Sequence, residues 1–270
     1  MVTGNFMERV TEIDDSRLDP YRNLKQNKHS AGADYFVAEG RFVVERLISS
    51  EFEIHSLLVS SEGFGDLKGL DSLSSPVFQV SRDVCGQLVG FPFHRGIMAC
   101  GKRIVRRRYL APGSAGRSLL VCCPDTVLAE NLGVIIRTAA ALGAEAVLTG
   151  QGAIDAFSRR AIRTSMGNCF RVPIIQPPDL LVELARLKSE YRFETIGLSL
   201  KQEAISISEM KFSDRTILML GNEEFGLRPE YDSICDRHTK IAMADGIDSL
   251  NVASAAAIAM FTFKQFSLSH

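Results

Sequence analysis

The sequence IAMADGIDSLNVASAAAIAM, residues 241–260, joins the end of an apolar strand to a glycine-containing loop and then to an alanine-rich helix. Ser249 and Asn251 precede that helix, and both residue types accept hydrogen bonds from the unpaired backbone N–H groups of a first helical turn. The alanines carry so little side chain that the helix can approach another backbone closely. Taken alone, the stretch predicts a capped, closely packed helix, and the segments before it decide whether it does more.

The composition is that of an ordinary globular protein, since 46% of the 270 residues are apolar and 23% are charged. The length allows two modest domains. No apolar run reaches the roughly 18 residues of a membrane helix, and Met1–Glu8 lacks the charged-then-apolar layout of a secretion signal, so we expect a cytoplasmic protein without membrane contact. The net charge is −1, so a nucleic-acid partner must be held by local basic patches.

The six cysteines do not form a metal-binding pattern. None stands in a C-x-x-C pair followed by a histidine partner, so no zinc or other metal site is expected. Cys122 and Cys123 lie in the apolar run 119–123, where free cysteine behaves as a small buried hydrophobe. We therefore predict structural thiols rather than nucleophiles.

Three segments precede the C-terminal half of the chain. Residues 1–18 are polar and predict a loosely ordered tail. Residues 19–101 alternate short apolar strands with helical patterns, which predicts a small α/β unit. Residues 102–117 contain no acidic residue and include Pro, Gly and Ser, which predicts an exposed basic linker. Two interpretations remain open for the arginines of this linker: they form a patch that faces phosphates, or they belong to a solvated hinge. These arginines are Arg103, Arg106, Arg107 and Arg108.

Residues 118–270 alternate short apolar strands with helices. Continuous apolar strands in this order predict an α/β fold with a mostly parallel sheet covered on both faces, and ligands of such sheets bind beyond the carboxyl ends of the strands. Neither G-x-x-x-x-G-K-[ST] nor G-x-G-x-x-G occurs, so the usual nucleotide phosphate loops are absent. The expected strands are 119–123, 144–149, 172–175, 195–200, 216–221 and 240–243, and the expected helices begin after Asn131 and Ser158 and cover 178–190, 229–236 and 251 onward.

The segment 130–143 predicts a helix with a charged residue in its apolar middle. Asn131 can cap its start, and Gly143 can close its C-terminal end. Arg137 lies among apolar residues, where a guanidinium is costly unless it reaches solvent or meets an anion. A functional arginine and a structural ion pair both remain open at this point.

The segment 155–167 carries a basic cluster. Ser158 predicts the N-cap of a short helix, on which Arg159, Arg160 and Arg163 lie within about a turn of each other. Such a cluster can meet phosphates. An exposed basic helix face is the plainer interpretation of this segment by itself.

The loop 220–227, with the sequence LGNEEFGL, directly follows a predicted strand. Gly221 and Gly226 permit backbone conformations and close approaches that suit a loop wrapped against a flat ligand. Glu223 and Glu224 would then lie at the rim. Adjacent acids on a loop are usually solvated, so this loop alone predicts little.

Four motifs follow one another along the C-terminal half: Asn131-Leu-Gly-x-x-x-Arg137, Arg163-x-Ser165-x-Gly167, Leu220-Gly-Asn-Glu223-x-x-Gly226, and Ile241-x-Met243 leading to Ser249-Leu-Asn251. In order and wording they resemble the SpoU (TrmH-like) branch of the SPOUT methyltransferases, which methylate the ribose 2′-hydroxyl of tRNA or rRNA. The resemblance covers about residues 118–265. The N-terminal unit also looks like that family's substrate-binding domain of L30e type, through the segments that begin at Phe36 and His94.

The resemblance implies an α/β domain with a deep trefoil knot at its C-terminal end, and a homodimer whose active site draws on both subunits. It also implies S-adenosylmethionine as the cofactor, bound by backbone around Leu198, Gly221, Ile241, Met243 and Leu250. RNA, either rRNA or tRNA, is the implied partner. Contacts to it are expected from the basic linker and the second motif, at Arg103, Arg106, Arg107, Arg108, Arg159, Arg160, Arg163 and Ser165.

Methyl transfer to a ribose hydroxyl, a very weak acid, needs help with the developing negative charge. The resemblance makes Arg137 the candidate. Because a charged arginine has no acceptor and is almost never deprotonated in proteins, we favour a role in orienting the 2′-oxygen or a phosphate and in stabilising charge, while a literal base stays open. The residues expected to hold Arg137, substrate and loops in place are Asn131, Glu223, Ser249 and Asn251.

Two positions depart from the family pattern, since Glu224 stands where Gly is common and Ala242 stands where Pro is common. An extra carboxylate near an RNA-binding rim repels phosphate, so substrate choice can differ. The main alternative is a non-catalytic RNA-binding protein on the same fold, against which the retention of the motif residues argues. A metabolic α/β enzyme acting on another nucleotide is disfavoured by the missing phosphate loop.

Overall fold

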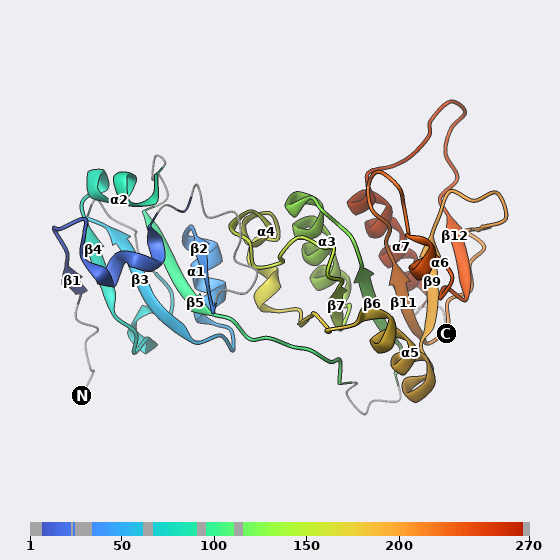
Figure 1. The fold of residues 1–270 in the computed structure, drawn as a ribbon, viewed down its shortest axis with the longest axis horizontal. Helices are drawn as coiled ribbons and strands as arrows, with labels where there is room; N and C mark the ends of the chain where they lie inside the picture. Colours follow the sequence, from blue (N-terminus) through green and yellow to red (C-terminus); the bar gives the residue numbers. More distant parts are fainter. Residues whose placement is uncertain are drawn as a thin grey trace. The chain divides into compact units, whose positions relative to one another are not determined.

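The computed structural model describes residues 7–22, 24, 34–61, 67–90, 96–110 and 116–266. The chain forms two compact units (Figure 1). The N-terminal unit comprises Met1–Ile104 and Phe157–Arg171, and the C-terminal unit comprises Val105–Ala156 and Val172–His270. The motif at His94 and the linker residues 111–115 lie outside the described residues.

The described part of the N-terminal unit is built on a mixed five-stranded sheet with the strand order β1-β4-β3-β5-β2. Strands β1, β4 and β3 run parallel, whereas β5 runs antiparallel to both β3 and β2. The strands are β1 (Met7–Arg9), β2 (Tyr35–Glu39), β3 (Ile54–Ser60), β4 (Val77–Val80) and β5 (Ile97–Lys102). Its helices are η1 (Ser16–Tyr21), α1 (Arg41–Ile48), η2 (Leu70–Ser72), α2 (Arg82–Val89), α4 (Arg159–Thr164) and η3 (Asn168–Phe170).

Residues 7–21 are part of this unit's ordered framework. Strand β1 extends the sheet beside β4, and η1 buries Leu18 and Tyr21 completely. The Tyr21 hydroxyl donates a 2.8 Å hydrogen bond to the backbone oxygen of Ser56. The structure thus differs from the predicted loose tail from residue 7 onward, because two apolar side chains in a polar stretch are enough to anchor it to the core.

An aromatic cluster fixes the segment 157–171 to the N-terminal unit. Phe157 and Phe170 stack on Phe36 of β2 with ring centroids 5.4 and 5.2 Å away. Phe52 packs edge-on against Phe36 at 5.6 Å. The sequence predicts this segment as part of a domain that starts at residue 118, but its aromatic contacts lie with the N-terminal unit, and local periodicity carries no sign of such long-range packing.

The described part of the C-terminal unit contains a seven-stranded sheet with the order β10-β12-β9-β11-β6-β7-β8, and every neighbouring pair is parallel. This confirms the predicted parallel α/β architecture. The strands are β6 (Ser118–Cys123), β7 (Ala146–Thr149), β8 (Ile174–Ile175), β9 (Glu194–Leu198), β10 (Ile205–Ser206), β11 (Arg215–Met219) and β12 (Arg237–Lys240).

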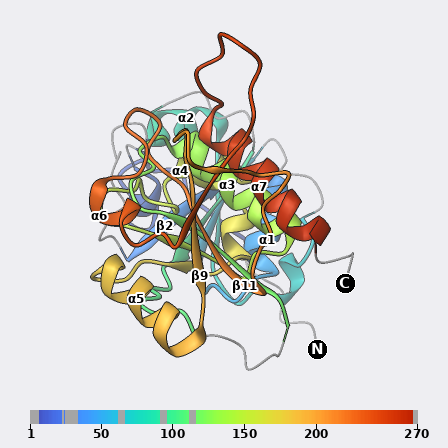
Figure 2. The same ribbon diagram turned by 90° about the vertical axis from the view of Figure 1, so that its right-hand side faces the viewer.

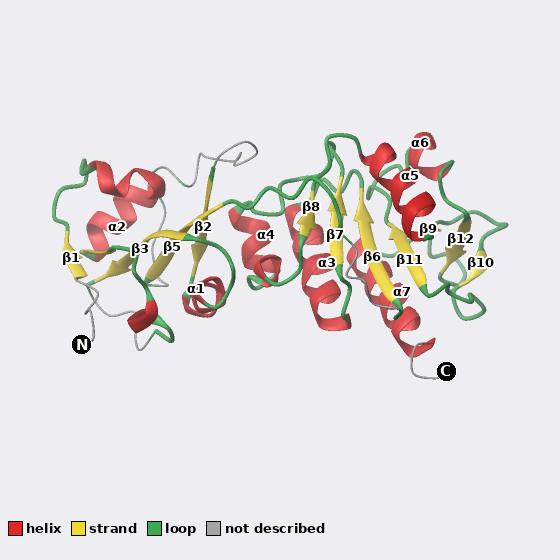
Figure 3. Cartoon of the chain, turned by 90° about the horizontal axis from the view of Figure 1, so that it is seen from below, coloured by secondary structure: helices red, strands yellow, loops and turns green. Residues whose placement is uncertain are grey.

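Helices cover both faces of this sheet (Figures 2 and 3). One face carries α3 (Ala129–Leu142) and α7 (Val252–Phe266), and the other carries α5 (Leu180–Tyr191) and α6 (Pro229–Asp232). Leu120 and Cys122 of β6 join the core cluster under α5, while the alternate residues Leu119 and Val121 are buried on the opposite side. Double-sided burial explains the continuous apolar strands of the sequence. No helix in the described part of the chain combines the length and the apolar character that a membrane crossing requires.

The basic linker is partly packed rather than exposed. Arg106 forms an isolated parallel bridge with Ile175, and Tyr109 is only 4% exposed. The Tyr109 backbone N–H donates to Glu183 at 2.9 Å, and its carbonyl accepts from Arg186 at 2.7 Å. The predicted exposure holds for Arg107, Arg108 and Leu110 but not for Tyr109, because the buried Glu183–Arg186 pair on α5 binds the backbone at this large aromatic residue.

Candidate functional site

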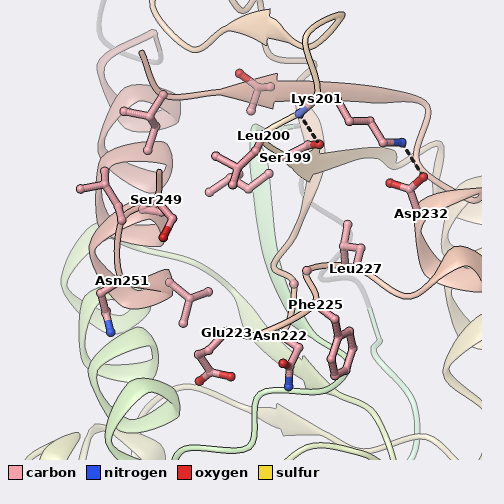
Figure 4. Close-up of a pocket in the computed structure, with 18 of the residues that line it drawn as sticks. Ser199, Leu200, Lys201, Asn222, Glu223, Phe225, Leu227, Asp232, Ser249 and Asn251 are labelled. Atoms are coloured by element: carbon pink, nitrogen blue, oxygen red, sulfur yellow. Dashed lines mark hydrogen bonds and ion pairs between the residues drawn. The ribbon is translucent and has the colours of Figure 1, made fainter. Parts of the chain in front are cut away.

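A cavity of about 810 Å³ lies beyond the carboxyl ends of β9, β11 and β12 in the C-terminal unit (Figure 4). This is the edge at which ligands of open parallel sheets bind. Its walls come from the loops that follow these strands and from the start of α7. The lining includes Leu198, Lys201, Gly221, Asn222, Glu223, Phe225, Asp232, Ile241, Met243, Ser249, Leu250 and Asn251, with Asn131 from α3.

The loop after β11 is held in a tight turn. The backbone N–H groups of Asn222 and Gly226 donate to each other's carbonyl oxygens at 2.8 and 3.0 Å. A Cβ atom added at Gly221 would lie 2.5 Å from the carbonyl carbon of Gly226, so the turn closes only around a residue without a side chain. The Asn222 side chain fastens the turn to the neighbouring loop by donating to the Asp125 carbonyl at 2.8 Å.

Three of the predicted catalytic residues form one hydrogen-bonded chain at an end of the cavity. Asn131 Nδ2 donates to Glu223 Oε1 at 2.7 Å, and Asn251 Nδ2 donates to Asn131 Oδ1 at 3.0 Å. Asn251 Oδ1 in turn accepts from the backbone N–H groups of Ala253 at 2.9 Å and Ser254 at 3.3 Å. The predicted cap of α7 is thus confirmed for Asn251, and the same side chain donates to Asn131 on α3.

Asn131 does not cap α3, contrary to the prediction. The helix begins at Ala129 after Leu128, whose side chain makes no capping hydrogen bond, so Asn131 lies inside the first turn. It is 8% exposed, and its amide is used between Glu223 and Asn251. An asparagine that caps a helix and one that faces inward from its first turn look the same in the sequence. Only the hydrogen bonds to Glu223 and Asn251, which are distant in the sequence, distinguish the two roles.

One carboxylate oxygen of Glu223 accepts no hydrogen bond from the described residues. This atom, Oε2, is buried. A buried acceptor without a donor is unfavourable, so a donor from a bound molecule or a small rotation of the side chain would satisfy it. The neighbouring Glu224 is exposed and does not line the cavity.

The opposite part of the cavity wall carries charges that the sequence did not reveal. Lys201 Nζ lies 2.6 Å from Asp232 Oδ2, and His238 Nε2 lies 2.8 Å from Asp232 Oδ1. The hydrogen bond from Lys201 lowers the pKa of Asp232, and Asp232 raises the pKa of Lys201. Lys201 and Asp232 do not belong to a recognisable motif, so no sequence pattern indicated that they line the cavity. Phe225 also lines the cavity and is 57% exposed.

The structure gathers all five residues predicted to hold the cofactor, since Leu198, Gly221, Ile241, Met243 and Leu250 all line this one cavity. Ser249 lines it as well and is exposed. The apolar side chains and the backbone of three loops thus face the same space as the Asn131–Glu223–Asn251 chain.

Arg137 is the predicted catalytic residue that the structure does not bring to the cavity of its own chain. It is exposed on α3 and makes no hydrogen bond or ion pair with any described residue. Val134, one turn away on α3, is 41% exposed. Ile258 and Phe261, on the adjacent α7, are 38% and 52% exposed. Arg137 therefore stands on a helix face that carries exposed apolar side chains.

The predicted RNA-contacting residues of the second motif separate into two groups. Arg159 pairs with Glu39 at 2.9 Å, and Ser165 is fully buried with its hydroxyl donating to Ile162 O at 3.0 Å. These two residues stabilise α4, which Ser158 caps as predicted. Arg160 and Arg163 are exposed.

The linker arginines are held to their surroundings to differing degrees. Arg103 lies over the Phe157 ring at 5.4 Å. Arg107 donates to the Gln176 carbonyl at 3.3 Å, and Arg108 is 62% exposed with its Nε atom 3.9 Å from Glu183.

The cysteines show no sign of nucleophilic character. Burial raises the pKa of Cys123 to about 12 and that of Cys122 well above its usual value, and Cys235 is likewise raised to about 12. Such thiols stay protonated at neutral pH and react slowly. Among the described residues, no group of three or more His, Cys, Asp or Glu side chains is arranged to hold a metal ion.

Relatives of known sequence match nearly the whole chain. Residues 118–261 match the model of the SpoU rRNA Methylase family. An uncharacterised tRNA/rRNA methyltransferase of Mycobacterium tuberculosis is 33% identical over 266 residues, which cover 96% of this chain and 92% of the relative. A 23S rRNA (guanosine-2′-O-)-methyltransferase of Acinetobacter baylyi is 31% identical over 81% of this chain and 92% of its own length.

Solved structures share the fold. The SpoU methyltransferase AviRb of Streptomyces viridochromogenes, in complex with AdoMet, superposes with a TM-score of 0.82 at 20% identity, covering 95% of this chain and all of the other. An AdoMet-bound rRNA methyltransferase of Sinorhizobium meliloti gives a TM-score of 0.79 at 23% identity, covering 96% and 98% of the two chains.

Proposed function

Because the chain belongs to the SpoU rRNA methylase family, we propose that it transfers a methyl group from S-adenosylmethionine to a ribose 2′-hydroxyl of ribosomal RNA or tRNA. The observation that carries the proposal is the hydrogen-bonded chain Asn131–Glu223–Asn251 at the end of an apolar cavity beyond the sheet. Several relatives are 23S rRNA methyltransferases, which makes ribosomal RNA the favoured substrate and the cytoplasm the expected compartment.

The cavity fits S-adenosylmethionine in size and chemistry. Its volume of about 810 Å³ lies in the range of small-molecule sites. Leu198, Ile241, Met243 and Leu250 supply apolar contacts for an adenosine, and the loop backbones supply donors and acceptors. The unpartnered Oε2 of Glu223 is an acceptor for a hydroxyl or ammonium group. When bound, the cofactor supplies an activated methyl group to the acceptor oxygen.

The residues of the chain provide orientation and charge stabilisation. Asn251 is fixed by its capping hydrogen bonds, Asn131 is fixed between Asn251 and Glu223, and the tight turn at Asn222 holds the backbone of Glu223. A site so constrained is preorganised, which lowers the reorganisation needed as charge develops on the ribose oxygen. Arg137 would supply the positive charge, by orienting the 2′-oxygen or an adjacent phosphate.

We place Arg137 in the site of a second copy. It is exposed on the same helix pair as Val134, Ile258 and Phe261, whose apolar side chains would be buried by a homodimer. A dimer formed through this face would bring Arg137 of one protomer toward the cavity of its partner. The deep trefoil knot implied by the resemblance would involve the loops that line the cavity, 221–227 and 241–250.

Transfer of labelled methyl groups from S-adenosylmethionine to purified ribosomal RNA and tRNA tests the proposal, and digestion to nucleosides locates the label. We expect label on ribose and none with Arg137→Ala. Label on bases, or full activity of that variant, would contradict the proposed chemistry. Failure to bind S-adenosylmethionine in calorimetry would favour the non-catalytic RNA-binding alternative.

A further inference from the structure

A second cavity, of about 410 Å³, lies wholly within the N-terminal unit. It forms between α1, the loop before η2 and the residue that follows η3. The side chains and backbone around it belong to Phe42, Glu45, Arg46, Lys68, Gly69 and Arg171. None of these residues belongs to the methyl-transfer site, and the sequence motifs single out none of them.

The charge around this cavity is positive. Three cationic side chains, Arg46, Lys68 and Arg171, surround it together with the carboxylate of Glu45. That carboxylate is held by Arg41 at 3.0 Å, and this hydrogen bond lowers the pKa of Glu45. The cavity thus offers cations to an anionic ligand in a chain whose overall charge is −1.

An aromatic ring stands beside these cations. Phe42, on the first turn of α1, is 67% exposed. A phenylalanine so exposed gains little from burial in the folded chain, and its ring is accessible to a flat ligand. Cations beside an aromatic platform are the combination by which proteins bind unpaired nucleotides, with phosphates on the cations and a base on the ring.

Hydrogen bonds hold the segments around this cavity to α1. Glu45 Oε1 accepts from the Lys68 backbone N–H at 3.3 Å, which ties the loop to α1. Arg46 donates to the Met166 carbonyl, which ties the segment after α4 to the same helix. Arg171 directly follows Phe170, whose ring is stacked in the aromatic core. Lys68 and Arg171 are themselves exposed.

We infer that this cavity, formed by Phe42, Arg46, Lys68 and Arg171, binds one unpaired nucleotide of the RNA substrate outside the methylation site. The base stacks on Phe42, and Lys68 and Arg171 contact the flanking phosphates. The inference rests on the proposed function for the identity of the RNA, but binding at this cavity needs no cofactor and no catalysis.

Binding of a short single-stranded RNA of mixed sequence to the full chain, without S-adenosylmethionine, tests the inference. We expect Lys68→Glu and Arg171→Glu to weaken binding about tenfold or more, and to reduce the slope of log affinity against log salt by roughly 0.7 for each lost phosphate contact. Phe42→Leu should weaken binding by about tenfold, whereas Phe42→Tyr, which keeps the ring, should bind as the unchanged protein does. With ribosomal RNA as methyl acceptor, KM should rise and kcat should stay the same.

Arg9→Glu is the matched control, because Arg9 is an exposed arginine of β1, at the edge of the sheet opposite to β2. An equal loss of affinity in this control would overturn the inference in favour of diffuse attraction. Tighter binding of adenosine monophosphate or guanosine monophosphate than of the RNA would overturn the inference, because the cavity would then be a site for free mononucleotides. A chain that binds RNA through this cavity and never transfers a methyl group would refute the proposed function and leave the inference standing.

Discussion

The amide of Asn131, in the first turn of α3, donates a 2.7 Å hydrogen bond to Glu223, on the loop after β11, across 92 residues of sequence. The same asparagine accepts from Asn251 at the start of α7. Its two amide atoms therefore join two distant segments of the cavity wall. An aspartate could not replace it, because a carboxylate has no N–H to donate and would repel Glu223.

Replacing Asn131 with alanine leaves Glu223 Oε1 and Asn251 Nδ2 without these partners. Since a hydrogen bond to a charged group contributes about 1.5–3 kcal/mol, we expect kcat/KM for methyl transfer to fall roughly 10- to 100-fold. Steady-state kinetics with RNA measures the loss, and calorimetry with S-adenosylmethionine should show a smaller change. Asn168→Ala is the control, because the Asn168 amide donates to a local carbonyl, at Ser165, and to no other described residue. Equal kinetic effects of the two substitutions would argue against a specific role of Asn131.

Arg137→Ala should leave the free energy of unfolding within about 0.5 kcal/mol, because the side chain is exposed and unpaired among the described residues. We nevertheless expect it to abolish methyl transfer. Mixed dimers distinguish the two possible arrangements of the site. A protomer carrying Arg137→Ala and a protomer whose cavity loop is disrupted by Gly221→Val should together regain activity if Arg137 serves the partner's cavity. Mixed dimers as inactive as either parent would place Arg137 in its own chain's site.

The parallel sheet was predictable because its strands are buried on both faces. The run at β6 is apolar at every position after Ser118, and it predicts the observed strand almost to the residue. Strand β12 was placed too late, at 240–243, because Arg237–Lys240 is polar and pairs with β9 and β10 through its backbone. The two-residue β10 is too short to leave a periodic pattern.

The residues of the site were predictable where they belong to a motif. Their hydrogen-bond partners and their burial were not, because these depend on how distant segments pack in the fold. Glu223 and Asn251 were named from their motifs, but the hydrogen bonds through Asn131 depend on one helix and two loops that meet only in the fold. Ser165 belongs to a motif and is nonetheless buried, with a local hydrogen bond. Lys201 carries no motif and still lines the cavity.

The homodimer can be tested through the exposed apolar residues of α7. Ile258→Asp and Phe261→Asp each place a charge where a partner would bury an apolar side chain. We expect both to shift the protein to a monomer in sedimentation velocity and to lose methyl transfer. Val182→Asp is the control, because Val182 is 65% exposed on α5, which covers the opposite face of the sheet. Unchanged sedimentation of the α7 variants would mean that any dimer uses another surface.

Glu183 should be among the more important polar residues for stability. It is 5% exposed, pairs with the 9% exposed Arg186 at 2.7 Å and accepts from the Tyr109 backbone. Glu183→Ala leaves a buried guanidinium without its main partner, so we expect a loss of about 3–5 kcal/mol in urea unfolding. Glu190→Ala removes the other, 55% exposed partner of Arg186, and it should cost at most about 1 kcal/mol. Similar costs for both variants would contradict the assigned importance of burial.

Glu194 makes stability depend on pH in a predictable direction. Burial alone would raise its pKa, but hydrogen bonds from Arg237, at 2.7 Å, and from Ser213 lower the pKa below its ordinary 4.5. The unfolded chain then binds this proton more readily than the folded chain, so the stabilisation is fully present above 4.5 and is lost as pH falls through the folded pKa. Glu194→Gln should therefore be less stable than the unchanged protein at neutral pH. The difference between their free energies of unfolding, measured in urea, should become smaller in acid. The exposed Glu209→Gln should show no such convergence. A gap for Glu194→Gln that stays constant with pH would show that its carboxylate charge does not contribute to stability.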